Sequence, residues 1–337
     1  MTNNIILLGH GSGGKLSHQL LDDVIIPRLS GLPQREQNDA AVLSHGGRRL
    51  AFTTDSYVVD PIFFPGGDIG DLAVNGTVND LAMSGARPLY LTVGLILEEG
   101  LPVADLERVL DSMKAAAAAA GVAIVAGDTK VVPRGKADKI FINTAGIGVF
   151  DHDLEILGSG ARVGDQILVN GTIGDHGMAV LAGREGLDLH SDIQSDTAPL
   201  HELVADLIAG VGRDLHVLRD PTRGGVATTL KEIALQSNVD LTLEEPALPV
   251  GEAVRGACAI LGLDPLYVAN EGKLLALLAP EAAGRALDIM HRHPQGRHAA
   301  IIGEVTGASA GKVYLRTAIG GLRAIEMLAG EQLPRIC

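Results

Sequence analysis

The chain of 337 residues has no tryptophan, only two cysteines, and aromatic side chains at just 3% of its residues. Two cysteines exclude a disulfide framework, so we expect reduced thiols in a cytoplasmic protein. Lysine and arginine number 27 against 41 acidic residues, and the resulting net charge of −14 argues against a general nucleic-acid binder. No apolar run approaches the ~18 residues of a membrane span, and no basic region of a signal peptide opens the chain.

Aliphatic residues and glycine are abundant instead. Hydrophobic residues make up 46% of the chain and glycines number 43, which predicts aliphatic cores joined by tight turns. The length suggests two domains. Apolar runs rich in valine and isoleucine predict strands over Leu50–Thr54, Leu89–Leu97, Val122–Ala126, Ile140–Val149 and Gln166–Asn170. Helical patterns cover Ile69–Ser84, Val103–Ala120, Pro199–Ala209, Gly225–Gln236, Gly251–Leu261 and Pro280–His291. A domain boundary is expected within Phe150–Val163, and a polar loop over Leu187–Thr197.

A glycine-rich segment follows the first apolar run. Its glycines at 9, 11 and 14 satisfy the dinucleotide pattern G-x-G-x-x-G, and Lys15 completes most of a P-loop. Leu16 stands where a P-loop needs serine or threonine, and no second strand with an acidic end follows. Two interpretations remain open, namely a mobile N-terminal loop and a phosphate-covering loop of another nucleotide fold.

Five aspartates lie at predicted strand ends, turns or on a helix: Asp39, Asp55, Asp80, Asp128 and Asp220. Any one of them is more typical of a cap or a turn. Together, without a histidine and cysteine cluster for zinc, they favour a site for Mg²⁺ and a nucleotide. Asp71, Asn75 and Asn79 recur at a spacing of four and form a polar stripe on an otherwise apolar helix, which is either part of that site or a solvated face.

The last residue, Cys337, carries one of the two thiols. Cys258 lies on a predicted helix with Val254 and Ala257 and is expected to be buried. The final stretch leaves the helical pattern and reaches Pro334, and about ten extended residues span roughly 33 Å. Cys337 is therefore either an untouched, frayed end or a thiol carried on a flexible arm to a site elsewhere.

Read together, these segments resemble the HypE family, the carbamoyl dehydratases of [NiFe]-hydrogenase maturation. That family belongs to the PurM-like superfamily of aminoimidazole ribonucleotide synthetase, thiamine-monophosphate kinase and selenophosphate synthetase. The resemblance runs end to end, and the Pro-Arg-Ile-Cys end distinguishes this member from the rest of the superfamily. The matching segments are 10–15, 38–41, 54–56, 64–70, 78–82, 127–131, 219–225, 270–273 and 334–337.

The resemblance implies an α+β, PurM-like fold of two domains. Residues 1–155 would form an ATP-binding and dimerisation domain that pairs with its copy into a β-barrel. Residues 156–325 would form an α/β sandwich domain, and residues 326–337 a flexible tail with the terminal cysteine. The implied partners are a second copy of the chain, the carbamoyltransferase HypF and the HypC–HypD complex, with no nucleic acid and no membrane.

The resemblance also implies the chemistry. HypF would load a carbamoyl group onto Cys337, and ATP would drive dehydration of the S-carboxamide to a thiocyanate, whose cyano group becomes an iron ligand on HypC–HypD. Glu271 would be the base, with Lys130 nearby. A loop carboxylate paired with Lys273 is the alternative for Glu271. The sign of the net shift in the pKa of Cys337 stays open, because its α-carboxylate raises the pKa while Arg335 lowers it.

The nucleotide is expected to contact His10, Gly13, Gly14, Lys15 and the aspartates at 39, 55, 80, 128 and 220. Mg²⁺ is expected on Asp55, Asp80, Asp128 and Asp220. His10 and His176 are histidines that either contact the substrate or are solvated. A small-molecule kinase of the superfamily and a nucleotide-binding scaffold are the alternative functions.

Overall fold

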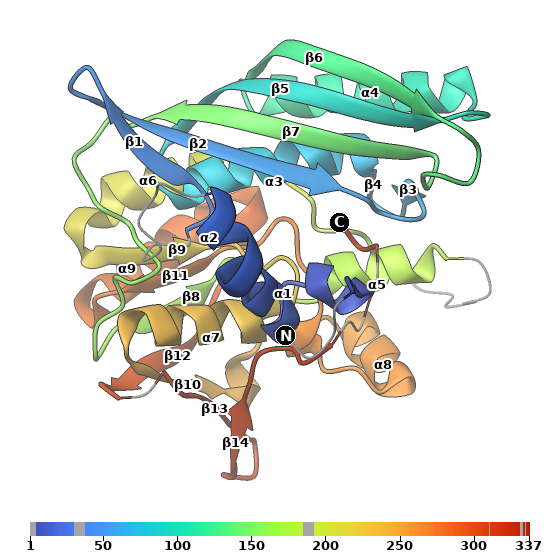
Figure 1. Cartoon of the computed structure of the whole chain (residues 1–337). Coiled ribbons are helices and arrows are strands. Elements are labelled where there is room, and N and C mark those ends of the chain that lie inside the picture. The colour runs from blue at the N-terminus through green and yellow to red at the C-terminus, as the bar shows by residue number, and fades with distance from the viewer. Residues whose placement is uncertain (1–4, 30–37, 185–191, 310, 331–332, 334) are drawn as a thin grey trace.

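The computed structural model describes residues 5–29, 38–184, 192–309, 311–330, 333 and 335–337. Two β-sheets lie one above the other, with helix α3 (Ile69–Met83) between them (Figure 1). The upper sheet is built from the first half of the chain and the lower sheet from the second half. No helix in the described part of the chain is long and apolar enough to cross a membrane.

The upper sheet has five strands in the order β1-β2-β7-β5-β6. β5 and β6 run parallel, and the other neighbouring strands are antiparallel. α3 and α4 (Val103–Ala119) cover one face (Figure 1). The opposite face is uncovered, so Phe52, Tyr90 and Ile147 are each exposed by 39–50%. The strands are β1 (Ala41–His45), β2 (Arg48–Tyr57), β5 (Arg87–Glu98), β6 (Ala123–Val132) and β7 (Ile140–Val149), with β3 (Phe63–Phe64) and β4 (Gly67–Asp68) in a separate hairpin.

Helix α3 is buried on nearly all sides because it packs against both halves of the molecule. Asp68 caps it, accepting hydrogen bonds from the backbone N–H groups of Gly70 and Asp71. A side chain at Gly76 would lie 2.2 Å from the hydroxyl oxygen of Tyr57, so glycine is required where the helix crosses β2. The predicted polar stripe is therefore not a solvated face, since Asn75 and Asn79 are buried against the second half of the chain.

The lower sheet has seven strands in the order β14-β13-β10-β12-β8-β11-β9. Helices α6 and α9 pack on one face and α7 on the other, each through aliphatic side chains. The strands are β8 (Gln166–Val169), β9 (Leu215–Arg219), β10 (Asp240–Glu244), β11 (Leu275–Leu278), β12 (Ala300–Gly307), β13 (Val313–Arg316) and β14 (Leu322–Ile325). The remaining helices are α1 (Lys15–Leu20), α2 (Ile26–Leu29), α5 (Asp175–Ala182), α6 (His201–Val211), α7 (Gly225–Ser237), α8 (Glu252–Leu261) and α9 (Pro280–Arg292).

All of the predicted strands and helices are present, with ends that differ by at most a few residues, except that β6 continues to Val132. The predicted boundary over Phe150–Val163 is an irregular connection between the two sheets. Of the predicted polar loop, residues 187–191 lie outside the described residues, and 192–197 have no helix or strand. The domain limits 1–155, 156–325 and 326–337 stay a prediction.

Candidate functional site

Four of the five predicted aspartates meet between the two sheets. Asp39 precedes β1, Asp55 lies on β2, Asp80 near the end of α3, and Asp220 directly after β9. Burial raises the pKa of Asp80 well above its usual value, and the charges of Asp220, Asp55 and Asp39 raise it further. The pKa of Asp220 is likewise raised, first by burial and then by Asp39. Four carboxylates from distant segments, of which Asp220 is buried and the other three are partly buried, thus repel one another.

One buried arginine partly offsets this charge. Arg219 donates from Nε to Asp39 at 2.7 Å and from Nη2 to Glu232 at 2.8 Å. Glu232 also contacts His18 of α1 at 2.9 Å, and this contact raises the pKa of His18. Asp39 Oδ2 and Arg219 Nη1 are buried without a hydrogen-bond partner. The pairs formed by His18, Glu232, Arg219 and Asp39 therefore leave Asp39 Oδ2 without a hydrogen-bond donor among the described residues.

These aspartates fit a hard cation. Mutual repulsion and the unpartnered Asp39 oxygen are both relieved when a divalent ion supplies positive charge. No group of three or more potential metal ligands is preformed among the described residues. Such an arrangement suits Mg²⁺, which usually takes only one or two carboxylates and completes its shell with water and phosphate oxygens.

The fifth aspartate, Asp128, lies apart from the other four within one chain. It is exposed on β6 and forms a 2.5 Å ion pair with Lys130, which is exposed as well. The strand register aligns Asp55 with Thr144, Thr144 with Val93, and Val93 with Gly127. Three steps of roughly 4.8 Å between neighbouring strands separate the Cα atoms of Asp55 and Gly127 by about 14 Å. Asp128 follows Gly127 directly and is therefore at a similar distance from Asp55. Lys130 is therefore not near Glu271 within one chain, contrary to what we expected.

The glycine-rich segment lies against the second half of the chain. A side chain at Gly13 would lie 3.0 Å from the carbonyl oxygen of Arg223, and one at Gly14 would lie 2.2 Å from that of Leu328. Lys15 donates its backbone N–H to the same Leu328 oxygen at 2.9 Å, and its side chain is exposed. His10 bonds to Leu7 in its own turn. A cavity beside this segment is lined by His10, Gly11, Gly13, Ser17, His18, Leu20, Leu21, Ile25, Asn38, Thr54, Arg219, Arg223 and Glu232.

The described part of the tail is docked between the two halves of the molecule. Val58 donates its backbone N–H to the carbonyl of Cys337 at 3.2 Å, and Asp60 donates to that of Arg335 at 3.1 Å. Arg335 forms ion pairs with Asp60 and Asp138. Ile336 is 4% exposed and belongs to the core under the upper sheet. The last residues therefore run beside the continuation of β2, as an added strand would.

Docking brings the thiol of Cys337 to Glu271. Burial raises the pKa of Cys337 well above its usual value, as do the charge of Glu271 and a hydrogen bond to it, while Arg223 opposes the rise. Arg335, expected to act on this thiol, is paired elsewhere. The pKa of Glu271 is also raised, by burial and then by Asp220, Asp196 and Asp55. A small cavity touching the thiol is lined by Asp55, Ser56, Tyr57, Gly76, Asp220, Thr222, Arg223, Glu271 and Cys337.

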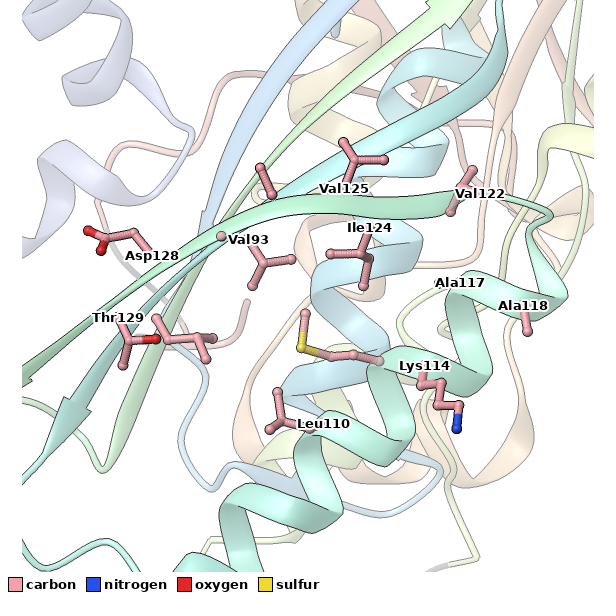
Figure 2. Close-up of a pocket in the computed structure, with 14 residues that line it drawn as sticks. Val93, Leu110, Lys114, Ala117, Ala118, Val122, Ile124, Val125, Asp128 and Thr129 are labelled. Carbon is pink, nitrogen blue, oxygen red and sulfur yellow. The ribbon is translucent and has the colours of Figure 1, made fainter.

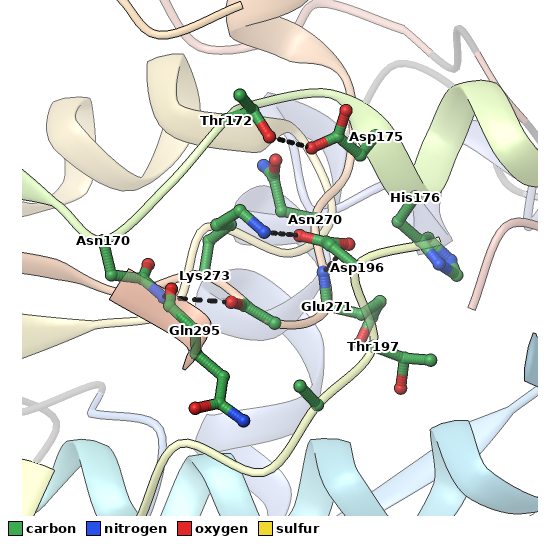
Figure 3. A network of polar contacts seen from close by, with 12 residues as sticks. Asn170, Thr172, Asp175, His176, Asp196, Thr197, Asn270, Glu271, Lys273 and Gln295 are labelled. Carbon is green, nitrogen blue, oxygen red and sulfur yellow. Dashed lines mark hydrogen bonds and ion pairs between the residues drawn. The ribbon is translucent and has the colours of Figure 1, made fainter. Parts of the chain in front are cut away.

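The backbone of Glu271 is fixed by a polar network (Figure 3). Its N–H donates to Asp196 at 3.1 Å, and its carbonyl accepts from Asn79 of α3 at 3.0 Å. Lys273 pairs with Asp196 at 2.8 Å, so the alternative pairing of Lys273 with Glu271 is wrong. The side-chain oxygen Oε1 of Glu271 is buried without a partner. The main chain is thus held in place while one carboxylate oxygen stays available to a substrate.

A second hollow lies between α4 and strands β5 and β6 (Figure 2). Aliphatic side chains such as Val93, Leu110 and Ile124 line it, and Lys114 and Asp128 are its charged members. It lacks the convergent buried carboxylates found around Cys337. The site whose residues could carry out a reaction is therefore the one between the sheets.

Several site residues were not assigned from the sequence. Arg223, Tyr57, Asp196 and the Arg219–Glu232 pair all contact the predicted residues. Arg223 had a signal, since it follows Asp220 by three residues and precedes a Gly-Gly at the start of α7. Asp196 had none, because it lies in an irregular segment and reaches its partners only through the tertiary fold.

The chain matches two family models and several curated relatives. The model "AIR synthase related protein, N-terminal domain" matches residues 37–150, and "AIR synthase related protein, C-terminal domain" matches residues 162–316. The chain is 52% identical to "Carbamoyl dehydratase HypE" of Azotobacter vinelandii, with 100% of this chain and 98% of that protein covered. The chain belongs to the HypE family.

Solved HypE structures have the same fold. "Crystal Structure of Hydrogenase Maturation Protein HypE in complex with ATP" is 54% identical, with a TM-score of 0.83, and covers 99% of this chain and 100% of that one. "Crystal structure of HypE-HypF complex" contains a chain 48% identical, with a TM-score of 0.87, and covers 92% of this chain and 99% of that one. The expected α+β, PurM-like fold and the resemblance to HypE are both confirmed.

Proposed function

We propose that the chain is an ATP-dependent carbamoyl dehydratase whose substrate is a carbamoyl group on its own Cys337. The observation that carries this is the contact between the Cys337 thiol and the buried Glu271, beside the aspartate cluster. A thiol with nothing to do would sit among apolar side chains or in solvent. This one lies beside Glu271, Arg223 and two of the aspartates, Asp55 and Asp220.

The reaction needs the amide oxygen converted into a leaving group. In the first step this oxygen attacks the γ-phosphorus of ATP, an O–P bond forms, ADP leaves, and the amide nitrogen gives one proton to Glu271. In the second step the C–O bond breaks, the last N–H proton passes to the departing phosphate, and the nitrile forms. The S-carboxamide on Cys337 and ATP thus become a thiocyanate, ADP and phosphate. The carbon stays bonded to the Cys337 sulfur throughout.

Each neighbouring group has a task in these steps. Asp55, Asp80 and Asp220 would hold Mg²⁺, with Asp39 less central because Arg219 already binds one of its oxygens. When bound, Mg²⁺ supplies positive charge to the phosphate oxygens. Arg223 is exposed and donates to the carbonyl of Gly11 at 3.0 Å, and its charge acts on Cys337, Asp55 and Glu271, where it would stabilise developing negative charge. The raised pKa of Glu271 makes its carboxylate a stronger base than an exposed glutamate once it is ionised.

A homodimer would bring in the two residues that one chain leaves outside. The uncovered face of the upper sheet exposes Phe52, Tyr90 and Ile147, an apolar surface typical of association. Asp128 and Lys130 lie on β6 at the edge of that sheet. We infer that a second copy covers this face, and that Asp128 and Lys130 then serve the nucleotide site of the assembled dimer, as the family resemblance implies. HypF as carbamoyl donor and HypC–HypD as cyanide acceptor complete the proposed pathway.

The test is the intact mass of the protein after incubation with its carbamoyltransferase, carbamoyl phosphate and ATP, and again after purification and addition of Mg–ATP. We expect one added carbamoyl group on the C-terminal peptide, then loss of one water that depends on ATP. Cys337→Ala should bind ATP as the unmodified chain does and gain no carbamoyl group. A carbamoyl group on that variant would contradict the assignment, and no adduct on the unmodified chain would favour a small-molecule kinase.

A further inference from the structure

His176 contacts the tail at the residue before the thiol. It is completely buried at the start of α5, and its Nε2 lies 2.7 Å from the carbonyl oxygen of Ile336. Its Nδ1 lies 2.8 Å from the hydroxyl of Ser195. The edge of the His176 ring meets Phe64, with centroids 5.5 Å apart and planes at 89°. Both ring nitrogens are therefore occupied, and the ring plane is fixed.

These partners determine which nitrogen of His176 carries the proton. Burial lowers the pKa of His176, so its ring is neutral and has one donor and one acceptor. A carbonyl only accepts, so Nε2–H donates to Ile336. Nδ1 then accepts from the Ser195 hydroxyl, whose oxygen accepts in turn from the backbone N–H of Thr197 at 3.2 Å. The chain of donors runs in one direction and leaves none of these atoms unpaired.

The elements that hold His176 also hold Glu271 (Figure 3). Ser195, which orients the His176 ring, adjoins Asp196, which binds the backbone of Glu271. Gly174, two residues before His176, donates its N–H to the side chain of Asn270 at 2.8 Å. Two short connections, one through Ser195 and Asp196 and a buried one from Gly174 to Asn270, thus set the spacing between the Ile336 carbonyl and Glu271.

We propose that His176 is the positioning residue of the tail: its hydrogen bond to Ile336 holds the docked segment so that the Cys337 sulfur stays against Glu271. The inference rests on the proposed function only for its kinetic part. It accounts for a buried, fully hydrogen-bonded histidine that takes no part in proton transfer.

Thiol labelling tests the proposal without relying on the dehydratase. Iodoacetamide is added to the folded, uncarbamoylated protein, and labelling of the two cysteine peptides is followed by mass spectrometry. In His176→Ala we expect Cys337 to be labelled about tenfold faster or more, because the buried Ile336 carbonyl loses the hydrogen bond from His176. In His176→Gln, whose amide can donate, the rate should return to within a few-fold of the unmodified protein. His201→Ala, at a histidine remote from the tail, is the matched control.

Cys258 reports on folding in the same sample. It is 1% exposed and packs near α5, so it should stay unlabelled in every folded variant. An unchanged Cys337 rate in His176→Ala with Cys258 protected would overturn the proposal. If Cys258 becomes reactive in that variant, Ser195→Ala decides instead, since it removes only the hydroxyl that orients the ring. A smaller rise at Cys337 would then support the proposal, and no rise would overturn it.

The kinetic part separates positioning from simple instability. With carbamoylated protein, His176→Ala should lower the rate of water loss about tenfold at saturating Mg–ATP, without changing the KM for ATP, and His176→Gln should restore the rate. A raised KM with an unchanged maximal rate would contradict a positioning role. If even the unmodified protein loses no water, the proposed function fails, and the labelling result still decides the role of His176.

Discussion

The two cysteines of this chain have different surroundings, and Cys258 is buried while Cys337 is partly buried. Cys258 lies on α8 among aliphatic side chains, and burial raises its pKa to about 11. Cys337 has its pKa raised by burial too, but Glu271, Asp55 and Arg223 also act on it. Cys258 is expected to be inert, because burial and, less strongly, the charge of Asp264 disfavour its thiolate. Beside Cys337, in contrast, Glu271 could act as a base and Arg223 supplies positive charge, so these surroundings suit a reaction.

Removing the base should have the largest effect. Glu271→Gln keeps the shape of the side chain and removes the proton acceptor, so we expect the rate of water loss from carbamoylated Cys337 to fall about 100- to 10,000-fold. The measurement is single-turnover mass spectrometry after addition of Mg–ATP. ATP binding should stay near that of the unmodified protein. A fall of less than tenfold would mean that Glu271 is not the base.

A charge removed from the aspartate cluster should have two opposite effects. Asp220→Asn takes away one repelling carboxylate, so we expect the nucleotide-free protein to melt at a higher temperature. The same change should weaken Mg–ATP binding about tenfold or more, because a cation ligand is lost. Differential scanning fluorimetry and titration calorimetry measure the two. A lower melting temperature together with unchanged affinity would show that Asp220 is a purely structural carboxylate.

The charged surroundings should also respond to pH. Asp80 and Asp220 have raised folded-state pKa values, so their contribution to stability is present at low pH and is lost as pH rises above about 4 toward the raised values. When these carboxylates have lost their protons, the Mg²⁺ of Mg–ATP should offset their negative charge. We therefore expect the rise in Tm caused by Mg–ATP to be greater at about pH 7.5 than at about pH 5.5. The Asp220→Asn variant is the control, and a shift that does not depend on pH would contradict the site.

Cys258 should show the smallest effect. Cys258→Ala removes one buried sulfur from an aliphatic cluster, and we expect a loss of about 1 kcal/mol in the free energy of unfolding. Carbamoylation and water loss at Cys337 should be unchanged. Denaturant titration and the mass assay measure the two. A lower rate of water loss in a folded Cys258→Ala protein would contradict the claim that Cys258 takes no part in the reaction.

Much of the fold was predictable where sequence periods are long. The ten-residue β7 was predicted with its observed ends, and α3 was predicted one residue longer than observed, because apolar residues repeat over many positions. Six strands of the lower sheet, from β9 to β14, were not predicted. Strands such as β9 and β11 are short and buried at every position, so they lack the alternation that marks a half-exposed strand.

The site was predictable in its residue types and only partly in its arrangement. Asp39, Asp55, Asp80 and Asp220 were grouped by their positions at strand and helix ends, and they do lie together. Asp128 has the same kind of sequence surroundings, yet it lies on β6, an edge strand of the upper sheet. The order of strands in a sheet cannot be derived from local residue patterns. Asp196 and Ser195 act through an irregular segment whose position depends on the packing of both sheets.

The tether between Cys337 and the rest of the chain has a kinetic consequence. A reactive group on the same chain meets its site at an effective concentration set by the linking segment, which for short flexible links is millimolar. As long as the proposed dimer stays assembled, the dehydration step should therefore proceed at the same rate constant when the protein is diluted. Only the steps that exchange the carbamoyl and cyano groups with other proteins should slow on dilution.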